Sequence, residues 1–401
     1  MPAAEIAMQV GSGRLDPVEV LTSHLEALEQ HSHLNAVITT CEEQALARAR
    51  AGVSGPLAGV PLLVKDLLDT AGVRTTYGSS IHRDHVPSAT AAAVARLEAA
   101  GAITIAKTNL HEFAWGVTSQ NPHYGFVQNP RKPGRVAGGS SGGNAAALAV
   151  DAGTLALGTD TGGSVRIPVA CCGGVGFKPT LGKVSIDGCR PLSPAFDTMG
   201  PMGRNVADCA LAHEVLTGER VPTPRLEGLV VGVLAEGPPL DRLEALGARL
   251  QEVSLPQPEA DLIAIFMVEC AISHRDTYPA RREEYGRDLQ LKFDGARQVP
   301  GIDVFEARDE LPRWRERVAR ELDVDLLVSP VLGMEPPPID CFEPDVRVEM
   351  TRHTRPFNNL GWPAIAIGDL QIAGRDDATV LAAALAYEQA YGAPASVVSR
   401  P

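Results

Sequence analysis

The sequence predicts an α/β protein built around a mixed or largely parallel sheet. Helical and strand-like patterns alternate along the first half of the 401-residue chain. Hydrophobic residues make up 44% of the chain and aromatic residues only 4%, so we expect an aliphatic core.

The predicted elements of the first half follow one another in regular order. The opening of the chain is expected to be helical, and Asp16 can cap a helix that has Pro17 at its first position. After it come strand 34–40, helix 42–51, strand 60–64, helix 90–100, strand 103–107, helix 142–151 and strand 154–158. Lys65 and Ser164 each come just after a strand, where ligands gather in open α/β sheets.

The second half opens with a predicted hinge at residues 221–224, which contain two prolines. A long charged helix is expected over residues 304–322, broken or kinked at Pro312. Gly368 and Asp369 predict a tight hairpin turn. The remaining predicted elements are strands 229–234, 325–329, 364–367 and 370–373 and a last helix over 378–391.

Charge and cysteine usage exclude several classes of protein. The formal charge of −13 argues against unspecific binding to nucleic acid and to anionic membranes. We see neither a signal peptide nor an apolar run of membrane-spanning length. The seven irregularly spaced cysteines fit a reducing cytoplasm. The nearest approach to a metal pattern, His82-Arg83-Asp84-His85, is read as a polar surface loop, so no metal and no organic cofactor are expected.

Two glycine-flanked serines are the strongest chemical signal. Residues 138–143 read Gly-Gly-Ser-Ser-Gly-Gly, and Gly162-Gly163 directly precede Ser164. A glycine pair can aim several backbone N–H groups at one point, as an oxyanion hole requires. A phosphate-binding loop would need a lysine and a hydroxyl immediately afterwards, whereas Asn144 and a run of alanines follow.

Each residue of this group also has a simpler interpretation. Ser164 alone could cap a helix, and Lys65 alone could be a surface residue. Lys65 ends an apolar strand, however, and burial lowers the pKa of a lysine, which can then accept a proton.

Taken together, the motifs resemble those of the amidase signature family. The resemblance rests on Gly59–Asp66, Gly138–Gly143, Gly158–Pro168, Cys172–Thr180 and Asp197–Met202, in this order and spacing. It is dense from about residue 57 to 204 and weaker over most of the rest. The resemblance implies a single α/β/α domain over residues 1–401 with a large mixed, mostly parallel twisted sheet. A motif-bearing core would cover about 55–205 and a variable, substrate-side region about 225–375.

The resemblance also implies a Ser–Ser–Lys triad. Ser164 would be the nucleophile, Lys65 the base, and Ser140, which would follow a cis peptide bond from Gly139, would bridge them. Backbone N–H groups would hold the oxyanion, from Thr161, Gly162, Gly163 and Ser164. For Asp160 and Arg166 an ion pair or loop support is the expected role.

Three residues are candidates for the substrate pocket: Trp115, Ser141 and Arg166. Trp115 is followed by Gly116 and a polar run, which suggests a loop at a cleft, whereas Phe113 is read as core. The segments at 234–252 and 367–370 are shorter than is usual in the family, and this puts the pocket, not the triad, in doubt.

The function implied is an amidase that cleaves a linear carboxamide through an acyl-serine intermediate and releases ammonia or an amine. A glutamine-amidase A subunit of a tRNA-dependent amidotransferase and a catalytically dead scaffold are the alternatives. The expected partner is a small-molecule amide, with no nucleic acid and no membrane, and a homodimer stays open.

Overall fold

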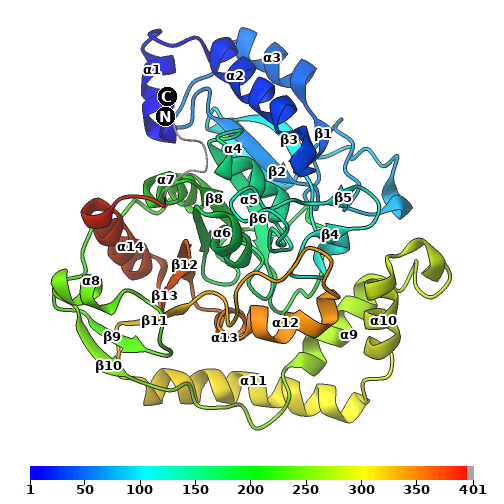
Figure 1. The fold of residues 1–401 in the computed structure, drawn as a ribbon, viewed down its shortest axis with the longest axis vertical. Helices are drawn as coiled ribbons and strands as arrows, with labels where there is room; N and C mark the ends of the chain where they lie inside the picture. Colours follow the sequence, from blue (N-terminus) through cyan, green and yellow to red (C-terminus); the bar gives the residue numbers. More distant parts are fainter. Residues whose placement is uncertain (395–401) are drawn as a thin grey trace.

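One twisted sheet of eleven strands runs through the chain, of which the computed structural model describes residues 1–394 (Figure 1). The strand order is β1-β3-β2-β6-β8-β7-β12-β13-β11-β9-β10. The strands are β1 (Val37–Thr40), β2 (Pro61–Lys65), β3 (Ile103–Thr108), β6 (Leu155–Asp160), β7 (Val175–Lys178), β8 (Thr198–Gly203), β9 (Val230–Val233), β10 (Arg249–Glu252), β11 (Leu326–Pro330), β12 (Ala364–Ile367) and β13 (Leu370–Gly374). A separate short ribbon joins β4 (Gln120–Asn121) to β5 (Gly125–Phe126).

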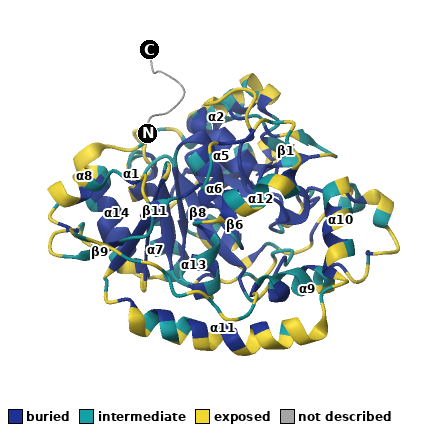
Figure 2. Ribbon diagram, turned by 60° about the horizontal axis from the view of Figure 1, so that its bottom comes forward, coloured by how far each residue is buried: buried dark blue, intermediate teal, exposed yellow. Residues whose placement is uncertain are grey.

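Helices cover the sheet, and Figure 2 shows the buried strands inside them and the exposed outer face of α11. They are α1 (Ala3–Gly11), α2 (Pro17–Gln30), α3 (Glu42–Arg50), α4 (Ala92–Ala99), α5 (Gly142–Ala149), α6 (Arg166–Cys172), α7 (Val206–Thr217), α8 (Leu240–Ala245), α9 (Ile263–Ser273), α10 (Arg287–Ala296), α11 (Gly301–Glu321), α12 (Glu343–Thr351), α13 (Arg355–Leu360) and α14 (Asp377–Tyr391). None of the helices within residues 1–394 is both long and apolar enough to span a bilayer.

The sheet is mixed, as predicted, but it is not largely parallel. Pairings β3-β2, β2-β6, β11-β9 and β9-β10 are parallel, and the other six neighbouring pairs of the described sheet are antiparallel. The predicted alternation of strand and helix holds only up to β6. After it, β8 pairs antiparallel with both β6 and β7, and β12 pairs antiparallel with β7 and, across a tight turn, with β13.

The central strand β2 is buried on both faces, and this decides where its last residue points. Leu62 and Val64 pack into a core cluster with residues of α1, α4 and α7. Leu63 packs on the opposite face, with residues of α2, α3, α5 and α6. Because side chains alternate along a strand, Lys65 lies on the Leu63 face, where α5 and α6 begin.

Two predicted elements differ from the structure. The strand predicted from residue 34 begins only at Val37, because Ser32–Leu34 form a 3-10 turn and Asn35 adopts a left-handed φ of 51°. The helix predicted to be broken or kinked at Pro312 is continuous over Gly301–Glu321, so the expected break is wrong. Pro312 is exposed, so the backbone carbonyl that loses its helical hydrogen bond can bind water instead. The predicted turn at Gly368 is confirmed, since β12 and β13 pair as a hairpin across it.

Candidate active site

The end of β2 and the loop before α5 bring a lysine and a serine together. Lys65 Nζ lies 2.7 Å from Ser140 Oγ and 2.7 Å from Thr159 Oγ1, on the neighbouring strand β6. Lys65 and Ser140 are both fully buried. The peptide bond between Gly139 and Ser140 is cis, as the family resemblance implies. Within residues 1–394 the lysine is therefore held by two hydroxyl groups and by no carboxylate.

Ser164 lies in the turn between β6 and α6 and faces the same loop. Its backbone oxygen accepts a hydrogen bond from Ser141 N at 3.3 Å, which ties the turn to the serine loop. The Ser164 hydroxyl makes no hydrogen bond within the described chain, and the residue is 6% exposed, whereas Ser140 is 0% exposed. Of the three predicted triad members, Ser164 is thus the one that reaches solvent.

Burial lowers the pKa of Lys65 to about 7, so that half of it is neutral near that pH. The same cause lowers the pKa of Lys178 to about 7 and also lowers that of Lys107. Lys178 Nζ donates to the backbone oxygen of Pro179, and Lys107 lies 3.4 Å from Asp66. Geometry, not pKa, therefore distinguishes Lys65, because only Lys65 among these lysines contacts a serine hydroxyl.

Asp160, at the end of β6, holds the turn that carries Ser164. Its carboxylate accepts hydrogen bonds from Gly163 N at 2.8 Å and from Val165 N at 3.1 Å. The fully buried Arg166 pairs with the same carboxylate at 2.9 Å and also donates to Asn358. Burial alone would raise the pKa of Asp160, but the Arg166 guanidinium outweighs it and holds that pKa below its ordinary value. This network fixes both ends of the turn.

Gly163 fits only as glycine. Its φ of 129° is one that L side chains rarely adopt, and a Cβ there would collide with the Thr354 side chain. Thr354 Oγ1 in turn donates to the backbone oxygen of Gly162 at 2.7 Å. Because Gly163 N–H already donates to Asp160, its predicted place in the oxyanion hole is wrong.

The predicted substrate-pocket residues lie elsewhere. Arg166 is fully buried and each of its nitrogens donates within the chain, to Asp160, Thr354, Asn358 or Gln371, so no donor remains for a ligand. The structural alternative, an ion pair with Asp160, is confirmed. Ser141 is also fully buried, with Oγ 3.4 Å from the backbone oxygen of Thr159. Both pocket assignments are therefore corrected: Arg166 and Ser141 are buried and support the turn that carries Ser164 from the protein interior.

Trp115 does not lie on an open loop. It is 1% exposed and packs edge-on against Phe293, with ring centroids 4.7 Å apart, and against Phe266. Its indole Nε1 is buried and has no hydrogen-bond partner in the part of the chain that the structure describes. The run Glu112–Ala114 before it forms a 3-10 turn that folds the ring inward, so the cleft position inferred from the following glycine is wrong.

Some residues around the turn of Ser164 were not predicted from the sequence, because they come from the far end of the chain. Thr354, Arg355 and Asn358 come from the start of α13, more than 180 positions after Ser164, yet they surround its turn. Nothing near Arg355 in the sequence marks it as part of a site. Thr159 could have been found, because it directly precedes Asp160 in the nucleophile motif.

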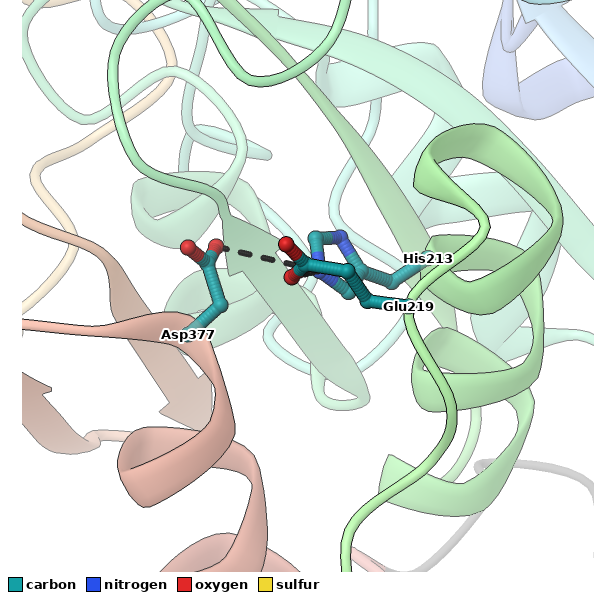
Figure 3. Close-up of side chains that lie close together, drawn as sticks. All are labelled: His213, Glu219 and Asp377. Atoms are coloured by element: carbon teal, nitrogen blue, oxygen red, sulfur yellow. Dashed lines mark ion pairs between the residues drawn. The ribbon is translucent and has the colours of Figure 1, made fainter.

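One cluster of potential metal ligands lies among the described residues: His213, Glu219 and Asp377 (Figure 3). His213 Nε2 is 3.9 Å from each carboxylate. Glu219 pairs with Lys183, and Asp377 accepts two hydrogen bonds from Thr180. The cluster joins α7 to the start of α14 and includes none of the residues around Ser164.

The comparison with protein families matches the model described as Amidase over residues 19–227. Among curated relatives, the A subunit of glutamyl-tRNA(Gln) amidotransferase from Thermus thermophilus is 33% identical over 97% of this chain and 97% of its own length. Its counterpart from Deinococcus radiodurans is 38% identical over 66% of this chain, and the match spans 62% of that protein. A crystal structure of an amidase has a TM-score of 0.86 at 33% identity and covers 97% of this chain and 99% of its own.

Proposed function

We propose that this chain, which belongs to the amidase family, cleaves a linear carboxamide through an acyl-serine intermediate on Ser164. Family members act on C–N bonds, and every position of the expected Ser–Ser–Lys group is occupied in this sequence. The observation that carries the proposal is the contact between Lys65 Nζ and Ser140 Oγ at 2.7 Å, in a loop that is hydrogen-bonded through Ser141 N to the backbone oxygen of Ser164.

In the proposed acylation, Ser164 Oγ attacks the amide carbon while its proton passes to Ser140 Oγ. The Ser140 proton passes in turn to neutral Lys65, which becomes an ammonium ion. When the tetrahedral intermediate collapses, the C–N bond breaks and a proton returns through Ser140 to the leaving nitrogen. Ammonia or an amine departs, Lys65 is neutral again, and the acyl group remains on Ser164.

Deacylation repeats these proton transfers with water in place of Ser164. Water attacks the acyl carbon, its proton passes through Ser140 to Lys65, and Ser164 leaves as the alcohol when that proton is returned. The negative oxygen of both intermediates would be held by the backbone N–H groups of Thr161, Gly162 and Ser164. The proposed catalysis uses only side chains and backbone of this chain.

A second candidate function is glutamine hydrolysis as part of an amidotransferase. The similarity to the Thermus thermophilus protein over 97% of the chain favours it. Ammonia release from purified protein separates the two candidates. A simple amidase hydrolyses aliphatic or aryl amides on its own, whereas glutamine as the only substrate would favour the amidotransferase function.

The test compares wild type with Ser164→Ala on that panel. We expect ammonia release from wild type and loss of at least 1,000-fold in Ser164→Ala, since removal of a nucleophile costs about this much or more. Cys341→Ala, a half-buried thiol outside the proton path, is the matched control and should retain activity. Equal activity of Ser164→Ala and wild type would overturn the proposal, and no activity in either would favour the scaffold alternative.

A further inference from the structure

Arg355, the first residue of α13, lies beside the turn that carries Ser164. Its Nε would be 4.0 Å from a Cβ built on Gly162, and no other atom would lie within that distance of the added carbon. Gly162 is two residues before Ser164. The guanidinium therefore stands next to the backbone that would hold the oxyanion, on the side left open by the glycine.

The guanidinium of Arg355 has no anionic partner. It makes no hydrogen bond and no ion pair with any residue from 1 to 394, and it contacts the face of the Phe266 ring, 5.9 Å from the centroid. Arg166, four residues beyond Gly162, donates to four different residues. A half-buried cation without a partner loses hydration that nothing in the described chain replaces.

A second arginine lies near Arg355 and, within residues 1–394, also has no ion-pair partner. Arg347 on α12 is half-buried, and its Nη1 is enclosed with no hydrogen-bond partner among the described residues. Burial lowers the pKa of Arg355 to about 10, and repulsion from Arg347 adds to this effect. Two guanidinium groups that repel one another next to a reaction centre are the arrangement that a bound anion stabilises.

Two acidic residues nearby attract Arg355 electrostatically, but within residues 1–394 neither forms an ion pair with it. Glu343 is buried and forms an ion pair with Lys292 at 2.7 Å, and it also accepts a hydrogen bond from Val117 N. Asp261 accepts from Ile263 N at 3.0 Å, in an exposed turn before α9. Neither carboxylate forms an ion pair with Arg347 or Arg355 within the described residues.

We propose that Arg355, backed by Arg347, binds a carboxylate group of the substrate, so that the chain acts on amides of acids that carry a second, free carboxylate. This inference rests on the proposed amidase function of Ser164. Guanidinium binds carboxylate through paired N–H donors. Because Gly162 has no side chain, the Arg355 guanidinium lies within van der Waals reach of the turn that carries Ser164. Because Arg355 and Ser164 flank the same short turn, the acid is small, with a few bonds between carboxylate and amide carbon.

The test uses matched pairs of substrates that differ only in charge. Malonamate, succinamate and glutaramate carry the carboxylate, and their methyl esters do not. We expect wild type to have at least a tenfold higher kcat/KM for one or more of the acids than for the corresponding ester. Arg355→Met should lose at least 100-fold on that acid and less than threefold on the ester, and Arg355→Lys should recover part of the loss. Arg352→Met, an exposed arginine one turn earlier, is the control and should change neither.

Binding without turnover gives a second measurement. In the Ser164→Ala background, calorimetry should show that Arg355→Met weakens binding of the preferred acid at least tenfold, with the melting temperature unchanged. Equal losses on acid and ester, or a wild type that prefers the esters, would overturn the carboxylate proposal. Labelling of Ser164 by a fluorophosphonate keeps the two proposals distinct: a labelled enzyme without acid preference contradicts only this one, and an unlabelled enzyme contradicts the proposed function.

Discussion

Lys65 and Ser140 are 75 positions apart in the sequence, and their side chains meet at 2.7 Å because β2 and the loop before α5 end on the same face of the sheet. The face is decided by alternation along β2, where Leu63 and Lys65 point to one side and Leu62 and Val64 to the other. Three chain segments therefore converge at this point: the end of β2, the serine loop and the turn after β6.

We predict that acylation follows the protonation of Lys65. Burial lowers the pKa of this lysine to about 7, and only its neutral form accepts a proton. The acylation rate should therefore be constant above about pH 8 and fall tenfold per pH unit below about pH 6. Lys65→Met should lower it by at least 1,000-fold. The measurement is the pre-steady-state rate of acyl-enzyme formation from pH 5 to 9.

Lys178 provides the control for this prediction. Its pKa is also lowered to about 7 by burial, but within the described chain its amino group donates only to the backbone oxygen of Pro179. Lys178→Met should leave the midpoint of the pH profile where it is in wild type. If the midpoint shifted in Lys178→Met and stayed unchanged in Lys65→Met, the titrating group would be Lys178, and the prediction for Lys65 would be wrong.

Gly163→Ala should strongly lower activity, because it changes the geometry of the turn. The added methyl group meets Thr354 at a φ of 129°, so the turn must move, and with it Ser164. We expect a loss of at least 100-fold in kcat. Gly182→Ala is the matched control, since it also has a positive φ, of 78°, but open space around it, and it should retain full activity. A crystal structure of Gly163→Ala with an unmoved Ser164 and full activity would refute this reasoning.

Asp160→Asn should destabilise the fold more than any surface change. It leaves the buried Arg166 guanidinium without its carboxylate, a loss of about 3–5 kcal/mol in the free energy of unfolding. The exposed pair of Arg313 and Asp309 gives the comparison, and Asp309→Asn should cost less than about 1 kcal/mol. Urea unfolding at pH 7 measures both, and similar values for the two variants would mean that the buried network does not hold the turn.

Trp115→Ala should lower stability without changing substrate preference. The ring is buried against Phe293 and Phe266, so its removal should cost about 3–5 kcal/mol. Ratios of kcat/KM across a series of acyl chain lengths should stay within threefold of wild type, whereas Trp115→Phe should restore most of the stability. A tenfold change in those ratios at an unchanged melting temperature would show that Trp115 lines the substrate pocket after all.

The structural features that the sequence predicted best are those that depend on one short segment of the chain. The end of β2 at Lys65, the turn before α6 and the hairpin at Gly368 follow from apolar runs bounded by glycine or charge. Strand order and direction could not be read from the chain, because antiparallel pairs such as β6 with β8 depend on long-range contacts.

The residues on the substrate side of the site could not be predicted from the sequence either. Arg166 stands next to the nucleophile in the sequence, a position that suggests a pocket residue, yet its charge is neutralised by Asp160. Arg355 is 191 positions from Ser164 and reaches the same turn with its charge unpaired. Sequence distance gives no information about which of two arginines is already neutralised by a buried partner. The division into a core at about 55–205 and a variable region at about 225–375 stays a prediction.

The most direct test of the whole account is the identity of the acylated residue. A fluorophosphonate probe should label wild type, and mass spectrometry of the digested protein should place the probe on Ser164, with labelling slowed by at least 1,000-fold in Lys65→Met. Labelling should be absent from Ser164→Ala and present in Ser141→Ala, because Ser141 is buried beneath the turn. A probe found on Ser140 or Ser141, or labelling that persists in Ser164→Ala, would contradict the account.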